Sequence, residues 1–130
     1  MNFAENSLST FFEKLNGGKF KLRYLLGSDN LVIKKTNECV VYQGSHGDKG
    51  AEIADIILPG SAYTEQDGYF TNLEGKIQKA QKASYPPGEA KEDWLILNEL
   101  ASKIKSKKLY KNKDELEKSM MNYLKLTNNE

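Results

Sequence analysis

Short apolar runs separated by glycine-rich or polar turns dominate the first sixty residues. Runs at residues 20–26, 39–42 and 56–58 have the length of strands, and a short helix is expected at residues 51–54. Apolar strands joined by short helical connections predict a parallel sheet whose strands are buried on both faces.

Apolar residues at helical spacing mark three further segments. The first predicts a helix that ends at Gly17-Gly18, the second a helix that follows the Pro-Pro-Gly sequence at residues 86–88, and the third a helix over residues 114–126. The apolar positions are Leu8, Phe11, Phe12 and Leu15 in the first segment, Trp94, Leu97, Leu100, Ala101 and Ile104 in the second, and Leu116, Met120, Tyr123 and Leu124 in the third. We expect the Trp94 side chain to pack on the apolar face of its helix.

Two other segments have a simple local interpretation. Residues 69–71 and 77–80 flank a turn at residues 72–75, which predicts a small hairpin. Residues 103–113 contain six lysines and predict a solvated linker.

Composition limits the possible functions. The chain has 130 residues, which is at most one domain, and its net charge of +1 argues against general affinity for nucleic acid or for acidic partners. A single cysteine, Cys39, excludes a disulfide framework and a multi-cysteine metal or iron–sulfur site within this chain. No apolar run is long enough to span a bilayer, and the N-terminal residues do not resemble a signal or transit peptide.

The sequence predicts too few helices to cover both faces of the sheet. Three short parallel strands need helices on both faces, and the first sixty residues supply only about one and a half helices. Open strand edges are a liability in an isolated protein. We therefore expect another polypeptide to complete this fold.

The loop from Gly44 to Gly50 is a candidate phosphate site. It follows a strand and precedes a short helix, the usual setting for a phosphate-binding nest. It matches neither the Walker pattern nor the dinucleotide-binding pattern. A tight strand-to-helix crossover in which the glycines adopt positive φ angles explains them better.

Single polar residues give weaker hypotheses. His46 with Asp48 could form an oriented general base, but no nucleophile or metal ligand accompanies the pair, so a loop-anchoring role is favoured. Cys39 is expected in the core. Asp55, between a helix and a strand, is expected to have a turn or capping role.

The segment Asn72–Gln78 is the most distinctive polar cluster. Asn72, Glu74 and Gln78 could grip a flat heterocycle through paired hydrogen bonds. They could equally satisfy backbone groups of the turn. The spacing does not decide between the two.

Several segments in order resemble a known family. The sequences YLLGSDN, VVYQGSHGDKGAEIADIILPGSAYTE, YFTNLEGKIQ and PPGEAKEDWLILNELA resemble the C-terminal region of the large iron–sulfur subunit of respiratory complex I, NADH:ubiquinone oxidoreductase. That region is similar to the molybdopterin oxidoreductases, whose motifs match Asn72–Gln78 and Pro87–Trp94. The run at Gln43–Ala51 is more typical of the complex I subunit. The resemblance covers roughly residues 20–104.

The resemblance implies a fold and a division of the chain. The expected class is α/β: a partial Rossmann-like parallel sheet of the molybdopterin oxidoreductase type, with a small hairpin and C-terminal helices, completed by a partner chain. Residues 1–104 would be the C-terminal portion of a molybdopterin oxidoreductase-like domain, and residues 105–130 a lysine-rich linker and terminal helix.

The resemblance carries over no site residues. The family's cluster-binding cysteine motifs are absent, so no catalytic, cofactor-binding or metal residue and no cofactor is expected. Lys76 stands where the family usually has arginine. The exchange removes a planar guanidinium group that can donate two hydrogen bonds to one ligand. Ser45 replaces what is often a histidine.

The implied function is structural. The chain would complete the relic molybdopterin-type domain of the large subunit in the peripheral arm, on the matrix side of the mitochondrial inner membrane or the cytoplasmic side of a bacterial plasma membrane. Its partners would be the rest of that subunit and neighbouring subunits, with no nucleic acid and no membrane insertion. Eighteen lysines against one arginine favour a split organellar gene over an expressed fragment. The alternatives are a fragment of an active molybdopterin-dependent oxidoreductase, a phosphate-binding module at residues 44–50, and a nucleic-acid binder at residues 103–113.

Overall fold

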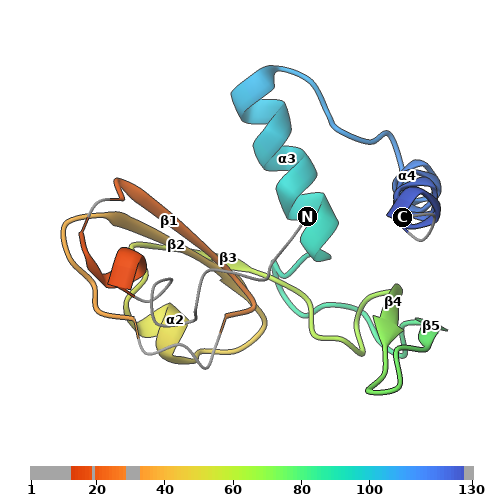
Figure 1. Ribbon diagram of the computed structural model, residues 1–130, viewed down its shortest axis with the longest axis horizontal. Coiled ribbons are helices and arrows are strands. Elements are labelled where there is room, and N and C mark those ends of the chain that lie inside the picture. The colour runs from red at the N-terminus through yellow and green to blue at the C-terminus, as the bar shows by residue number, and fades with distance from the viewer. Residues whose placement is uncertain (1–12, 19, 29–32, 128–130) are drawn as a thin grey trace. The chain divides into compact units, whose positions relative to one another are not determined.

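Three short strands of the chain form a parallel sheet. The computed structural model describes residues 13–18, 20–28 and 33–127. Strands β1 (Leu22–Leu26), β2 (Cys39–Gly44) and β3 (Ile56–Pro59) are hydrogen-bonded in the order β1-β2-β3 (Figure 1). This confirms the predicted mixed α/β class and the parallel pairing.

One face of this sheet carries the core. Leu25 aligns with Tyr42 across β1 and β2, and Val40 lies two residues before Tyr42 on the same face. These three residues and Ile33 are buried together, and Leu15, Ala51, Ile53 and Ala54 pack against them. Helical residues 13–16 and the short helix α2 (Lys49–Glu52) therefore cover this face. The helix predicted at residues 51–54 forms two residues earlier.

The opposite face is only partly covered, because Val41 and Gln43 of β2 are buried there but flanking positions of β1 and β3 are exposed. Leu22, Leu26 and Ile56 alternate with the core residues, and their side chains are 57%, 46% and 48% exposed. The expectation of strands buried on both faces is therefore wrong for β1 and β3. Cys39 is also exposed, so its expected place in the core is wrong. The physical reason is that Cys39 opens β2 in register with Leu22, on this partly covered face.

The predicted hairpin is confirmed. Strands β4 (Gly68–Thr71) and β5 (Ile77–Ala80) pair antiparallel in a separate two-stranded sheet. Gly75 adopts a φ of +80° in the connecting turn, a conformation that a β-carbon disfavours.

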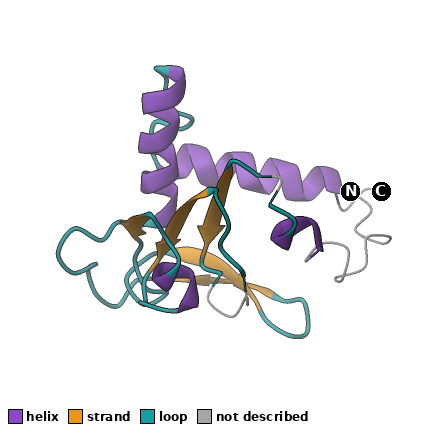
Figure 2. Ribbon diagram, turned by 90° about the vertical axis from the view of Figure 1, so that its left-hand side faces the viewer, coloured by secondary structure: helices purple, strands orange, loops and turns teal. Residues whose placement is uncertain are grey.

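Two longer helices follow. They are α3 (Asp93–Lys105) and α4 (Lys113–Thr127), drawn with the other helices in purple in Figure 2. Ile96 is buried and Trp94 is half-buried, but Ile104 is 73% exposed, so the predicted apolar face is wrong at its last position. Ile104 lies in the final turn of α3, beside exposed lysines. In the predicted N-terminal helix, residues 13–16 are helical, whereas Leu8, Phe11 and Phe12 lie outside the described residues.

The chain forms two compact units, residues 1–93 and 94–130. The division into residues 1–104 and 105–130, which the family resemblance implies, stays a prediction. Among the described residues, no helix is both long and apolar enough to cross a membrane.

Candidate functional site

A buried polar network occupies the carboxyl end of the parallel sheet, which is where α/β proteins usually bind ligands. Gln43, near the end of β2, is fully buried. Its Nε2 donates to Asp93 Oδ1 at 2.7 Å and lies 3.3 Å from the Asp93 carbonyl oxygen. The Tyr24 hydroxyl donates to Gln43 Oε1. Protein groups thus engage both ends of the Gln43 amide.

The backbone around this network is closely packed. Lys91 pairs with Gly60 in a parallel bridge, and the Ser61 amide donates to the Lys91 carbonyl oxygen at 2.9 Å. A β-carbon at Gly60 would lie 2.9 Å from Asp93 Oδ1. A side chain at this position would displace the Asp93 carboxylate from its place beside Gln43. The end of β3 and the Pro87–Trp94 motif meet here, which the sequence alone did not indicate.

The network also affects a titratable group. Burial, followed by the negative charge of Asp93, raises the pKa of the Tyr24 hydroxyl above its usual value near 10. The hydroxyl therefore stays protonated at neutral pH and can keep donating to Gln43.

The Gly44–Gly50 loop is a strand-to-helix crossover, but the positive φ angles predicted for its glycines are wrong, since Gly44, Gly47 and Gly50 do not adopt them. A β-carbon at Gly44 would lie 2.3 Å from the Tyr42 hydroxyl oxygen, and one at Gly50 would lie 2.7 Å from the Tyr42 ring. The Tyr42 hydroxyl donates to the His46 carbonyl oxygen at 3.0 Å. The two glycines thus make room for a buried tyrosine, which explains them without a phosphate.

His46 and Asp48 do not form the hypothesised base. The His46 ring lies in solvent, with Nδ1 2.8 Å from Ser45 Oγ, and makes no hydrogen bond to Asp48 in the described structure. Asp48 precedes α2 as its N-cap residue, and its side chain makes no capping bond. Neither residue has a geometry that points to proton transfer.

The Asn72–Gln78 turn shows which of its two interpretations holds for Asn72. Asn72 Oδ1 accepts hydrogen bonds from the Glu74 amide at 3.0 Å and the Lys76 amide at 2.8 Å. Glu74 and Gln78 are exposed. Asn72 therefore satisfies its own turn.

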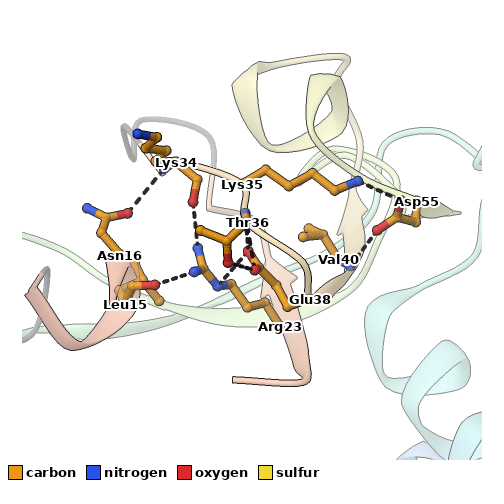
Figure 3. Close-up of polar contacts among 9 residues, drawn as sticks. All are labelled: Leu15, Asn16, Arg23, Lys34, Lys35, Thr36, Glu38, Val40 and Asp55. Carbon is orange, nitrogen blue, oxygen red and sulfur yellow. Dashed lines mark hydrogen bonds and ion pairs between the residues drawn. The ribbon is translucent and has the colours of Figure 1, made fainter. Parts of the chain in front are cut away.

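A second buried network holds the connection between β1 and β2 (Figure 3). Arg23 Nε lies 3.1 Å from Glu38 Oε1, and both side chains are almost fully buried. Arg23 also donates to the Lys34 carbonyl oxygen at 3.3 Å and to the carbonyl oxygen of Leu15. The only arginine of the chain thus ties β1 to the following connection and to the helical residues before it.

Glu38 is held as an anion within this network. The hydrogen bond from the Thr36 hydroxyl, backbone hydrogen bonds and the charge of Arg23 lower the pKa of Glu38, against the opposing effect of burial. The first of these causes is the largest. Glu38 therefore carries its charge at neutral pH.

Asp55 has a structural role, but its side chain bonds residues distant in the sequence and does not make, within the described structure, the turn or capping contact that was predicted. Its Oδ2 accepts a hydrogen bond from the Val40 amide at 2.8 Å, and its Oδ1 lies 2.5 Å from Lys35 Nζ (Figure 3). The Lys35 and Val40 hydrogen bonds lower the pKa of Asp55. The carboxylate thereby fixes the start of β2.

In the second unit, Asn98 organises the connection between the helices. Its Oδ1 accepts from the Leu109 amide at 2.8 Å and the Tyr110 amide at 3.1 Å, and its Nδ2 donates to the Tyr110 carbonyl oxygen at 2.8 Å. Asn98 is buried. This residue was not predicted from the sequence, where the only hint is a polar residue within an apolar helical segment.

The described residues contain no group of three or more histidine, cysteine or acidic side chains that could hold a metal ion.

Comparison with known proteins identifies the family. The model of the family named molybdopterin oxidoreductase matches residues 1–103. The chain belongs to the molybdopterin oxidoreductase family. A solved structure with this type of fold, acetylene hydratase from Pelobacter acetylenicus, superposes with a TM-score of 0.55 at 25% identity, over 72% of this chain and 15% of that chain.

Curated relatives within this family point to one complex. The chain is 45% identical over 112 residues to the NADH-ubiquinone oxidoreductase 75 kDa subunit of Reclinomonas americana, covering 84% of this chain and 16% of the relative. It is 49% identical over 94 residues to the mitochondrial 78 kDa subunit of Candida albicans, covering 71% and 13%. It is 53% identical over 97 residues to a subunit of the NADH-quinone oxidoreductase of Rickettsia bellii, covering 74% and 14%. The chain thus spans about a seventh of the length of these relatives.

Proposed function

We propose that this chain is a structural part of the large iron–sulfur subunit of NADH:ubiquinone oxidoreductase. Its role is to complete the relic molybdopterin-type domain of that subunit in the peripheral arm. Identities of 45% to 53% to three subunits of this enzyme support the proposal. Electron transfer from NADH to quinone takes place in neighbouring regions, and this part supplies shape and support.

The observation that carries the proposal is the exposure of β3. Ile56 and Ile57 point to opposite faces of this edge strand and are 48% and 54% exposed. Strands of parallel sheets are normally buried on both faces. Full burial of such a side chain stabilises a protein by roughly 1.5 to 3 kcal/mol relative to exposure. A partner that covers β3 would recover a part of this free energy.

The polar networks support a role without chemistry. Gln43 is bonded to Tyr24 and Asp93, and Asn72 to its own turn, so these groups hold the fold. We infer that the chain binds no redox centre itself. The finer proposals are that a split gene encodes it separately and that it lies on the matrix side of the mitochondrial inner membrane, or on the cytoplasmic side of a bacterial plasma membrane.

The test is separation of mild-detergent extracts of the source membranes on a native gel, with an NADH dehydrogenase stain and mass spectrometry of the stained band. We expect this sequence at a one-to-one ratio with the other part of the large subunit. Recovery of the sequence only outside that band would contradict the proposal. Recovery in an assembly with stoichiometric molybdenum would favour the alternative, a fragment of an active molybdopterin-dependent oxidoreductase.

A further inference from the structure

The connection between α3 and α4 concentrates positive charge. Residues 103–113, here called the lysine connection, contain six lysines and no acidic residue, whereas the rest of the chain has thirteen basic and eighteen acidic residues. Five of these lysines are exposed, and within the described residues none of their ammonium groups pairs with a carboxylate: Lys103, Lys105, Lys107, Lys108 and Lys111. A near-neutral chain thus carries one strongly basic segment.

The lysine connection has a fixed backbone. Asn98 holds it through three hydrogen bonds of 2.8 to 3.1 Å to Leu109 and Tyr110. The Lys111 amide donates to Glu115 Oε2 at 2.7 Å, which ties the end of the connection to the first turn of α4. Because its backbone is ordered in advance, the segment loses less conformational entropy when a partner binds.

Apolar side chains lie among the lysines. Ile104 is 73% exposed and Leu109 is 54% exposed. Apolar anchors surrounded by charged residues are the usual composition of a protein interface with a polar rim. The linker interpretation explains the lysines but not the exposed apolar residues or the Asn98 hydrogen bonds.

We propose that the lysine connection is a docking surface for an acidic segment of a neighbouring protein subunit. This inference rests on the proposed function, which supplies the neighbour. Residues 104–113 lie beyond residues 1–103, which the family model matches. The charge of the segment selects a partner rich in aspartate or glutamate.

A protein partner fits this surface better than a lipid bilayer or RNA. Two exposed apolar residues form a much smaller apolar face than helices that lie in a bilayer surface present. Tyr110 is the only aromatic residue of the connection and is half-buried, so it offers little for base stacking.

The test uses the intact complex purified with this chain in place. A carbodiimide joins a lysine amine to a carboxylate as an amide with loss of water, so it links only groups that are in contact. We expect mass spectrometry to find links from Lys107, Lys108 or Lys111 to aspartate or glutamate of another subunit. Links confined to this chain would overturn the inference.

Charge-neutral variants provide the second arm. The triple variant Lys107→Gln, Lys108→Gln, Lys111→Gln should be retained in the complex roughly tenfold less well than the unaltered chain at about 0.05 M salt, because three ion pairs that each contribute modestly are lost. The difference should shrink at about 0.3 M salt, because those pairs are then screened in the unaltered chain as well. The control Lys14→Gln, Lys21→Gln, Lys49→Gln, which removes three exposed lysines elsewhere, should behave as the unaltered chain.

The outcomes separate the two proposals. Equal retention of both triple variants at all salt concentrations would overturn the docking surface and leave the proposed function standing. Another outcome is that the unaltered chain binds vesicles of phosphatidylcholine with cardiolipin, the first triple variant does not, and no cross-links to a subunit form. This outcome would overturn the docking surface in favour of a lipid surface. Absence of the unaltered chain from the complex would contradict the proposed function and remove the partner with it.

Discussion

Gln43 and Asp93, fifty residues apart in the sequence, are joined by a hydrogen bond of 2.7 Å from Nε2 to Oδ1. This bond ties the end of β2 to the first residue of α3. Because the Gln43 side chain also accepts from the Tyr24 hydroxyl, one buried amide connects three segments of the first unit. We expect the fold of this unit to depend on that connection.

Replacing Gln43 should therefore destabilise the chain. We expect Gln43→Leu to lower the free energy of unfolding by roughly 2 kcal/mol, because the Tyr24 hydroxyl and the Asp93 carboxylate lose their partner. Urea denaturation followed by circular dichroism measures this change. Gln78→Leu, at an exposed position of β5, is the control and should change stability by less than about 0.5 kcal/mol. Equal effects of the two substitutions would contradict the role of the network.

The Arg23 network predicts that lysine cannot replace this arginine. Lysine keeps the charge, but a single ammonium cannot reach Glu38 and the Lys34 and Leu15 carbonyl oxygens with the geometry of a guanidinium. We expect Arg23→Lys to cost about 2 kcal/mol of unfolding free energy in the same measurement. Lys21→Arg, an exposed exchange two residues earlier, should be close to neutral. An unaffected Arg23→Lys variant would show that the hydrogen bonds specific to the guanidinium do not stabilise the connection.

Acid should unfold the chain through its lowered carboxyl pKa values. A carboxyl whose pKa is lower in the folded state stabilises the fold above its unfolded pKa, and this contribution is lost as the pH falls. For Glu38 the loss begins near its usual pKa of about 4.5 and continues below it. The Thr36 hydroxyl is the largest cause of the lowering, so Thr36→Val should move the midpoint of acid unfolding to a higher pH. Circular dichroism across an acid titration tests this, with Thr71→Val as the exposed control; coincident midpoints would count against it.

The Asn98 hydrogen bonds predict a local effect in the second unit. We expect Asn98→Ala to speed hydrogen exchange of the Leu109 and Tyr110 amides roughly tenfold or more, because both amides donate to Asn98 Oδ1. Exchange in β2 should not change. The control is Asn122→Ala, at an exposed position of α4. Unchanged exchange at residues 109 and 110 would mean that other contacts hold the connection.

The elements of the fold could be predicted from the sequence where local pattern decides them. Apolar runs at β1, β2 and β3, the turn residues between β4 and β5, and the helical spacing in α3 and α4 all indicated the observed structure. Exposure was harder to predict. Cys39 and Ile104 have core-forming side chains, but their burial depends on which face is covered, and that depends on the arrangement of distant segments.

The polar networks could not be predicted for a related reason. Gln43 with Asp93 and Arg23 with Glu38 are contacts between segments far apart in the sequence, and periodicity carries no information about them. The Asn72 turn was only half predicted, because the same residues at the same spacing suit a ligand or a backbone turn.

The central claim is that a partner covers β3 in the assembled enzyme, and hydrogen exchange measured by mass spectrometry tests it most directly. The measurement compares peptides covering Ile56–Pro59 in the isolated 130-residue chain and in the purified NADH:ubiquinone oxidoreductase, with the β2 peptide Cys39–Gly44 as internal reference. We predict that exchange in β3 slows at least about tenfold on assembly while the already buried β2 changes little. Equal exchange of β3 in the two samples would contradict the claim, because the strand would then be uncovered in the complex as well.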